Sequence, residues 1–393
     1  MRYHVNMKKP VKPLKSLDQP LSLLGGITAT HFLDEYWQKK PLLIRAALPG
    51  FDGFLSPEEL AGMACEEDVQ SRLVTQFKQD WQLQQGPFEE EDFLKLPEKG
   101  WTLLVQAVNQ HLQDGADLLQ QFDFIPHARL DDLMISYAPD GGGVGPHFDS
   151  YDVFLLQGQG QRLWRISGQT DLALVEGAPL RILANFHTEQ EWVLNPGDML
   201  YLPPHLAHWG VAVGDCMTYS IGFRAPSQQE LASEFLAFLQ EKSQPHRLYA
   251  DPDLALQAHP AEIHAHMIDK VSDMLEQVRW QRSDVAEFLG RYLSEPGADV
   301  VFAVPRAISL ATFRKRVNSS GIALDLKSRM LFNDRHMFIN GDIVIQEPSS
   351  ATILMDLADK RTLPGSVAGD IDEPLWRLLH EWYSAGYLQF PGH

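Results

Sequence analysis

Two short stretches of this chain hold residues whose types and spacing suit metal chemistry. His147 and Asp149 lie two residues apart, directly after the glycine-rich run Gly141–Gly145. In an extended strand, residues i and i+2 face the same side, so an imidazole and a carboxylate would project together as adjacent ligands of one metal ion. A histidine and an aspartate at this spacing also occur by chance as locally hydrogen-bonded loop residues. The pair therefore indicates a metal site only if a third ligand can be found.

The sequence offers two candidates for that third ligand, His205 and His208. Gly197-Asp198 leads into a short predicted strand, Pro203 ends it, and His208 follows. This order resembles the second motif of cupin-type barrels, in which a histidine after a proline turn faces the barrel interior. The register favours His208 as the ligand and leaves His205 as a loop residue near the rim.

Two histidines and one carboxylate form a facial triad with open coordination positions, the ligand set of non-haem Fe(II) oxygenases. Zinc accepts the same ligands, so the residue types alone do not choose the metal. If 2-oxoglutarate chelates Fe(II), its far carboxylate needs a buried cation, and arginine suits bidentate carboxylate recognition. Arg162 and Arg224 both qualify on position. Ser136 and Tyr137 could add hydroxyl groups, although each of these residues could equally be structural.

The elements expected to position these residues are short strands separated by turn signals. They begin after Asp132, and this texture predicts a barrel or jelly roll, a mainly β catalytic core. The strands are predicted at residues 133–138, 150–157, 161–167, 192–194, 199–203, 209–213 and 216–223.

The chain before this core is expected to form a helical flank. We predict helices from a cap at Thr30 to Pro41, from a cap at Ser56, and over Trp101–Phe122. A strand is predicted in residues 41–48, and residues 1–26, rich in Lys and Pro at the start, are expected to be a loose tail.

After the core, the predicted secondary structure changes first to helices and then to a mixture of helices and short strands. A capped amphipathic helix is predicted from Ser227, and residues 264–293 are largely helical, with an apolar stripe that favours core packing. From about 301 onward, a helix near Ser309–Val317, three short strands with a hairpin at Asn340-Gly341 and two closing helices resemble a winged-helix or small α+β domain.

Composition narrows the function classes. The 393 residues predict two or three domains, and 52 Asp and Glu against 33 Lys and Arg leave a net charge of −19. That charge argues against a nucleic-acid surface as the main partner and favours a basic one. Two cysteines, Cys65 and Cys216, indicate a reduced, cytoplasmic protein, and no apolar run predicts a signal peptide or membrane span.

Several stretches resemble the Jumonji-C (JmjC, cupin-like) ribosomal oxygenases, and among them the bacterial enzymes that hydroxylate an arginine of large-subunit ribosomal protein sixteen. The matching stretches, from about Phe32 to about Ile263, are FLDEYWQKKPLLIR, SRLV, GPFEEEDF, WTLLVQAVN, LDDLMISYA, GGGVGPHFDSYDVFLLQGQGQRLWRI, PGDMLYLPP, YSIGFRAP and DPDLALQAHPAEI. The glycine-rich HxD stretch and the RLWR strand are the most specific of these. Two departures are Gln161, where a basic residue is expected, and His205.

This resemblance implies Fe(II) held by His147, Asp149 and His208, and 2-oxoglutarate held by Arg162 with help from Ser136. Arg224 then becomes structural or part of the rim. The resemblance also implies dioxygen as cosubstrate and a homodimer built through the helices after the barrel. Because a ribosomal substrate is basic, we expect acidic residues to hold its guanidinium. The candidates are Asp131, Asp132 and Asp152.

Together these observations predict a double-stranded β-helix of the JmjC type with flanking helices, followed by two further regions. The expected division is a tail at 1–26, a catalytic domain at 27–226 with its barrel core at about 130–226, a helical dimerisation region at 227–296 and a winged-helix-like domain at 297–393. The expected function is Fe(II)- and 2-oxoglutarate-dependent hydroxylation of an arginine β carbon in a large-subunit ribosomal protein. Two alternatives are hydroxylation of another residue, such as histidine, and a non-enzymatic DNA-binding regulator.

Overall fold

The computed structural model describes residues 18–77, 80–242, 248–344 and 350–391. They fall into two compact units. One comprises Pro226–Glu295 and the segment from Arg329. The other holds the N-terminal part through Ala225, Pro296–Ser328 and the C-terminal segment. Residues 1–17 of the expected loose tail lie outside the described residues. The rest of that tail is ordered, because Leu23 and Leu24 are buried and anchor β1 (Pro20–Leu21) and a 3₁₀ turn at Ser22–Leu24.

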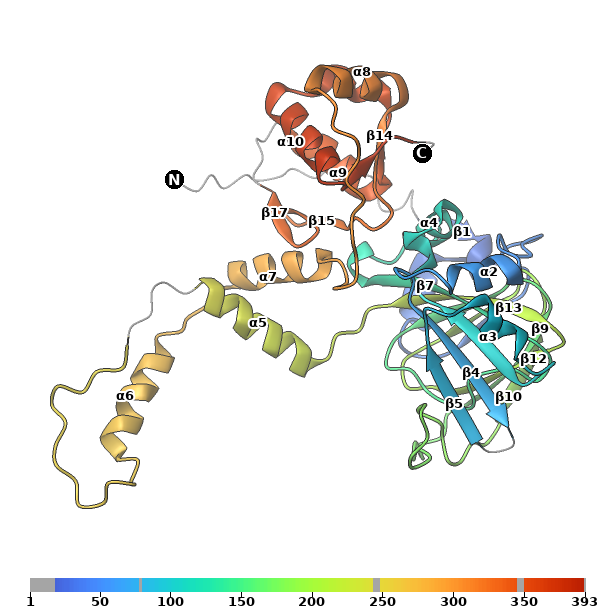
Figure 1. Ribbon diagram of the computed structural model, residues 1–393, viewed down its shortest axis with the longest axis horizontal. Coiled ribbons are helices and arrows are strands. Elements are labelled where there is room, and N and C mark those ends of the chain that lie inside the picture. The colour runs from blue at the N-terminus through green and yellow to red at the C-terminus, as the bar shows by residue number, and fades with distance from the viewer. Residues whose placement is uncertain (1–17, 78–79, 243–247, 345–349, 392–393) are drawn as a thin grey trace. The chain divides into compact units, whose positions relative to one another are not determined.

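Two antiparallel sheets form the catalytic core (Figure 1). The larger sheet has the strand order β3-β11-β8-β13-β7-β6-β4-β5, and the smaller has the order β10-β9-β12. The expected double-stranded β-helix is confirmed. The strands of the larger sheet are β3 (Leu42–Ile44), β4 (Ser71–Phe77), β5 (Asp80–Gln85), β6 (Trp101–Val105), β7 (Leu130–Ala138), β8 (Val153–Gln157), β11 (Met199–Leu202) and β13 (Cys216–Phe223). Those of the smaller sheet are β9 (Gln161–Ser167), β10 (Gln190–Leu194) and β12 (Ala207–Val213).

The two faces of the larger sheet pack against different parts of the protein, because alternate side chains of a strand point to opposite sides. One face packs against the N-terminal helices through a large apolar cluster that includes Leu133, Ile135, Phe154, Tyr201 and Tyr219. The other face, together with the smaller sheet, encloses a second cluster that includes Leu155, Trp164 and Leu200. Side chains on this inner face therefore line the barrel interior, where the candidate site residues lie.

The predicted helix over Trp101–Phe122 is wrong in its first half. Residues 101–105 form β6, which pairs with β4 and β7, and the helix α4 begins only at Gln113 and ends at Gln120. Leu103 and Val105 pack into the outer cluster, while Thr102 and Leu104 are buried on the opposite face. Burial on both faces removes the apolar-polar alternation that marks a strand, so tertiary pairing decided this segment. The flank is consequently not all helical: β4, β5 and β6 extend the larger sheet, and β4 and β5 lie side by side in Figure 1.

The helices of the N-terminal flank are short. α1 (Ala29–Glu35) is capped by Thr28, whose hydroxyl accepts from His31 N, and not by Thr30 as predicted. α2 (Pro57–Met63) begins at the predicted cap Ser56 with a complete capping box to Glu59. A further helix, α3, spans Glu90–Leu94. Phe32 of α1 is fully buried against Phe154 and Tyr201, which anchors this flank to the sheet.

The helical unit after the barrel contains α5 (Gln228–Lys242), α6 (Ala265–Glu276) and α7 (Arg282–Ser294), together with β15 (Met330–Phe332), β16 (Met337–Ile339) and β17 (Asp342–Val344). Phe338 of β16 lies against Gly290 of α7, so the three strands pack on that helix. The expected boundary between residues 296 and 297 therefore divides this unit, because α7 lies before the boundary and β15, β16 and β17 lie after it. The core-packing interpretation of the apolar stripe is wrong for α6, which has no buried residue.

The C-terminal elements of the other unit surround a small three-stranded sheet, β18-β14-β19. The helix expected near Ser309–Val317 is α8, which Ser309 caps, and Phe313 of this helix packs against Trp376, Tyr383 and Phe390. The bounds are α8 Leu310–Ser320, β14 Ile322–Leu324, α9 Ala351–Lys360, β18 Thr362–Leu363, α10 Glu373–Ser384 and β19 Leu388–Gln389. Among the described residues, no helix has the length and apolar character needed to cross a membrane.

Candidate active site

The structure brings His147, Asp149 and His208 together at one end of the barrel. One ligand atom from each of the three lies within 4.8 Å of the other two. Asp149 Oδ2 is 3.9 Å from His147 Nε2 and 3.5 Å from His208 Nε2, and the two imidazole centroids are 4.2 Å apart. Such a cluster of two imidazole nitrogens and one carboxylate oxygen can hold a divalent transition-metal ion on one face and leave the other face open.

Backbone pairing sets the separation of the two histidines. His147 and His208 form an isolated antiparallel bridge, in which each backbone N–H donates to the other residue's carbonyl oxygen at 2.9 and 2.8 Å. His208 belongs to β12, whereas His147 lies in the loop between β7 and β8. The bridge therefore attaches the glycine-rich loop to the smaller sheet and places both rings on the same side.

Each histidine ring is oriented by a backbone carbonyl two residues earlier. His147 Nδ1 is 2.9 Å from Gly145 O, and His208 Nδ1 is 2.9 Å from Leu206 O. A carbonyl can only accept a hydrogen bond, so Nδ1 carries the proton in both rings and Nε2 keeps its lone pair. Metal-binding histidines are commonly oriented in this way. Neither carbonyl was expected from the sequence, because residue types do not reveal which backbone carbonyl a histidine ring will contact.

Burial keeps His208 neutral. Its side chain is almost entirely enclosed, and burial followed by the nearby His147 lowers its pKa to about 4. A histidine must be neutral to bind a metal ion, so this environment prepares His208 for that role at neutral pH.

His205 lies outside the ligand cluster. Its side chain is exposed, with the ring centroid 6.1 Å from that of Phe148, and its backbone adopts a left-handed conformation with φ of 64°. Its backbone N–H donates to Asp149 O at 2.7 Å. His205 thus supports the loop that carries Asp149 through its backbone, while its side chain faces the rim.

Arg162 is a buried cation that pairs with no carboxylate of the described residues. Its side chain is on the inner face of β9, it is only 4% exposed, and its Nε and Nη2 atoms have no hydrogen-bond partner among the described residues. The nearest aromatic neighbour is Trp164, with the guanidinium carbon 5.8 Å from the ring centre. Leaving charged donors buried and unpaired is costly, which indicates that an anionic ligand completes this site. The donor set therefore fits both a metal ion at the triad and a dicarboxylate that reaches Arg162.

Comparison with known proteins agrees with this geometry. Residues 117–231 match the family model of the JmjC domain, and residues 277–389 match that of a ROXA-like winged helix. The chain is 39% identical over 277 residues to the ribosomal protein uL16 3-hydroxylase of Escherichia coli, covering 70% of this chain and 73% of that protein. It is 46% identical over 210 residues to a probable ribosomal oxygenase of Haemophilus influenzae, covering 52% of each chain.

Solved structures give the same result. The Escherichia coli ribosomal oxygenase YcfD in complex with cobalt and 2-oxoglutarate superposes with a TM-score of 0.78 at 34% identity, covering 92% of this chain and 98% of that one. Another structure of the same protein gives a TM-score of 0.80 at 34% identity, covering 92% and 97%. This chain belongs to the JmjC ribosomal oxygenases. It is accordingly a 2-oxoglutarate-dependent dioxygenase that uses Fe(II), 2-oxoglutarate and dioxygen.

In this oxygenase, the two hydroxyl candidates on β7 point in opposite directions. Ser136 is 5% exposed on the inner face, opposite Thr218 of β13, and therefore lines the barrel interior. Tyr137 faces the outer cluster, where its ring packs against Trp101, and burial together with Asp215 raises its pKa to about 12. The prediction that Tyr137 could assist the cosubstrate is wrong, because adjacent residues of a strand alternate between faces.

Arg224, the second arginine candidate, follows β13 and is hydrogen-bonded to residues at the start of β7. Its Nε donates to Asp131 at 3.1 Å, its N–H donates to Arg129 O, and its carbonyl accepts from Arg129 Nε. It therefore joins the end of β13 to the start of β7 and already has an anionic partner, Asp131.

Two of the three acidic candidates for holding the substrate have structural partners instead. Asp152 is fully buried and accepts from Tyr201 Oη at 2.6 Å and Gln38 Nε2 at 2.9 Å. Asp132 accepts from the backbone N–H of Ala107 at 2.9 Å. Asp131, paired with Arg224, keeps a half-exposed carboxylate. The expectation that Asp152 holds the substrate is contradicted by its complete burial.

Gly143 lets the entry loop approach β12 closely. A Cβ on Gly143 would lie 2.4 Å from Gly210 O, which is shorter than van der Waals contact, so a side chain there would displace the loop or the strand. Gly143 therefore helps to set the distance between the two histidine-bearing segments. Gly210 has a different role, because a Cβ there would lie 2.7 Å from the ring of Trp164 on β9.

Proposed function

We propose that this oxygenase hydroxylates the β carbon of an arginine side chain in ribosomal protein uL16. The observation that carries the proposal is the unpaired Arg162 guanidinium enclosed in the same barrel as the His147, Asp149 and His208 cluster. The relative named uL16 3-hydroxylase, similar over most of both chains, supports the substrate.

The residues have separate roles in this proposal. His147, Asp149 and His208 hold Fe(II) through two Nε2 atoms and one carboxylate oxygen. Arg162 binds the distal carboxylate of 2-oxoglutarate, and the Ser136 hydroxyl assists from the opposite sheet. Bound iron supplies the activation of dioxygen, while the protein's own residues fix the orientation of cosubstrate and substrate.

The charge of the chain supports a basic partner. A net charge of −19 attracts a basic ribosomal protein at long range, and this attraction weakens as salt screens it. Asp131, at the strand end beside the barrel, remains a candidate for contact with the target guanidinium. We place the reaction in the cytoplasm, where newly made ribosomal proteins occur.

The test is mass spectrometry of purified uL16 after incubation with the protein, Fe(II), 2-oxoglutarate and air. We expect a mass gain of one oxygen on an arginine, with one succinate released for each hydroxylation. An arginine that stays unmodified while another residue gains oxygen would replace the arginine proposal with another target. Full biological activity in a His147→Ala variant would support the regulator alternative.

The helical unit supports a homodimer. Five apolar side chains on and directly after α6 are between one third and two thirds exposed, which is unusual for the surface of a monomer. They are Met267, Ile268, Val271, Leu275 and Val278. We infer that a second copy of the chain covers this stripe.

Light scattering after size exclusion tests the homodimer. Leu275→Glu is expected to shift micromolar protein to the monomer mass, because a charge would enter an apolar interface. Asp273→Asn, on the opposite face of the helix, should leave the dimer intact. A monomeric wild-type protein would contradict the inference.

A further inference from the structure

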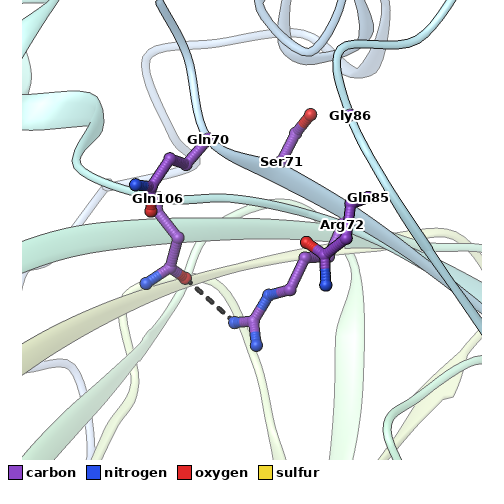
Figure 2. A pocket seen from close by; sticks show the side chains of 6 residues that line it. All are labelled: Gln70, Ser71, Arg72, Gln85, Gly86 and Gln106. Atoms are coloured by element: carbon purple, nitrogen blue, oxygen red, sulfur yellow. Dashed lines mark hydrogen bonds between the residues drawn. The ribbon is translucent and has the colours of Figure 1, made fainter. Parts of the chain in front are cut away.

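A polar pocket opens at the ends of β4, β5 and β6, outside the barrel proper (Figure 2). Its volume is about 280 Å³, and it is lined by Gln70, Ser71, Arg72, Gln85, Gly86 and Gln106. Figure 2 shows the side chains of Arg72, Gln85 and Gln106 on one side of the strands and that of Ser71 on the other. None of these residues belongs to the metal cluster or to the Arg162 site.

Strand register places this pocket on the same face of the sheet as the active site. Arg72 pairs with Leu104, and Leu104 pairs with Ser136, so Arg72 and Ser136 share one row of the inner face. Two strand spacings separate their backbones, roughly 10 Å.

The pocket also lies at the metal end of the sheet. Gln106 directly follows Val105, which pairs with Ile135 in the middle of β7, and its amide reaches Asp132 nearer the start of that strand. β8 begins just after the loop that carries Asp149. A polypeptide that presents a side chain to the metal centre can therefore extend over the pocket.

The pocket is oriented by a hydrogen-bonded chain of side chains. Asp132 accepts from Gln106 Nε2 at 3.4 Å, and Gln106 Oε1 accepts from Arg72 Nη2 at 3.2 Å. This chain fixes the Gln106 amide with its oxygen toward the guanidinium. Arg72 Nε is buried and has no hydrogen-bond partner among the described residues. The guanidinium is thus held at one edge and keeps an unused donor at the other.

We propose that this pocket is a second subsite for the substrate protein, which binds a hydrogen-bond acceptor in the segment flanking the hydroxylated residue. The inference rests on the proposed function, because it concerns the same substrate. The acceptor is a carboxylate or carboxamide side chain or a main-chain carbonyl. The charge of Arg72 favours an acceptor over a lysine or arginine beside its Nε.

Steady-state hydroxylation of intact uL16 by the full chain tests the subsite. Arg72→Met should raise KM for uL16 by about 10- to 150-fold, the effect of losing a hydrogen bond to a charged group, with kcat within twofold of wild type. Arg72→Lys keeps the positive charge but loses the planar guanidinium with its several N–H donors, so its KM should lie between those of wild type and Arg72→Met. The affinity for 2-oxoglutarate should not change, and this constancy also shows that the variants fold.

Arg165→Met is the matched control, because Arg165 is a strand arginine paired with Glu191 on the outer face of the smaller sheet. Replacing acidic residues that flank the target in uL16 by amides identifies the acceptor. The Arg72→Met penalty shrinks if the acceptor is a carboxylate and persists if it is a carbonyl.

Binding of labelled uL16, measured by fluorescence anisotropy, separates the two ways in which the reasoning can fail. If wild type binds and hydroxylates uL16 while Arg72→Met and Arg165→Met behave alike, the subsite is wrong and the proposed function stands. If wild type neither binds nor hydroxylates uL16, both are overturned.

Discussion

Replacing Arg162 by methionine should change stability and cosubstrate affinity in opposite directions. In the protein without cosubstrate, Arg162 has two buried donors without partners, and each such group costs about 1–3 kcal/mol. Methionine fills similar space without that cost. The free energy of unfolding without 2-oxoglutarate should therefore stay equal to that of wild type or rise by about 1–3 kcal/mol.

The affinity for 2-oxoglutarate should fall steeply in the same variant. Removing one partner of a buried, hydrogen-bonded charge pair costs about 2–5 kcal/mol. Because each 1.4 kcal/mol is a factor of ten, Kd should rise about 30- to 4,000-fold. Urea unfolding without cosubstrate measures the first effect. Anaerobic calorimetric titration with 2-oxoglutarate and Mn(II) measures the second.

Arg224→Met is the control, since Arg224 is already paired with Asp131. It should bind 2-oxoglutarate like wild type and lose a little stability. The reasoning is refuted if Arg162→Met binds 2-oxoglutarate with unchanged affinity, or if Arg224→Met is the variant that loses it.

Three further predictions concern the metal site and its supports. The pKa of His208 is lowered to about 4 in the folded protein, so the unfolded chain binds more protons between about pH 6.5 and 4. The metal-free protein should therefore lose up to about 3 kcal/mol of its free energy of unfolding as pH falls through that window. Urea unfolding at pH 7 and pH 5 should show a smaller loss in His208→Gln than in wild type. Gly143→Ala should weaken Fe(II) binding at least tenfold, because its Cβ would lie 2.4 Å from Gly210 O. The control Gly62→Ala has open space around the new Cβ and should bind Fe(II) like wild type. Unchanged metal affinity in Gly143→Ala would contradict the idea that the loop needs this close approach. Asp152→Ala should lower the free energy of unfolding in urea by about 1–3 kcal/mol, because the Tyr201 hydroxyl loses its acceptor, while KM for uL16 stays constant. A raised KM with normal stability would show instead that Asp152 contacts the substrate.

Local patterns were sufficient for most of the barrel and for the C-terminal elements. The predicted caps Ser56 and Ser227 each accept from the backbone N–H of the third residue along, and Ser309, at the start of the expected C-terminal helix, does the same. The strands from β7 to β13 lie within a few residues of their predicted places, because glycine and proline turns separate them. The expected hairpin at Asn340-Gly341 has positive φ at both residues.

The predictions failed where contacts distant in sequence decide the structure. Residues 101–105 are apolar on both faces and become a strand only because β4 and β7 flank them. The apolar stripe of α6 was assigned to a core, but periodicity shows only that one face is apolar and not what covers it. Asp152 has the residue type of a substrate contact, and only the folded chain shows that Tyr201 and Gln38 surround it.

The sequence by itself determined the chemistry available to this protein: the ligand types at His147, Asp149 and His208, the presence of a candidate arginine, and the acidic charge that suits a basic partner. Residue type and short spacing carry that information, because two residues of chain separation keep His147 and Asp149 close even though the structure places them in a loop and not on the expected strand. Only the tertiary structure decided which arginine is free. The sequence alone does not distinguish Arg162 from Arg224. In the structure, Arg162 on β9 is buried with two donor atoms unpartnered among the described residues, while Arg224 at the end of β13 pairs with Asp131. The free energy of a buried charge depends on everything packed around it, and strand pairing across the barrel brings those neighbours together.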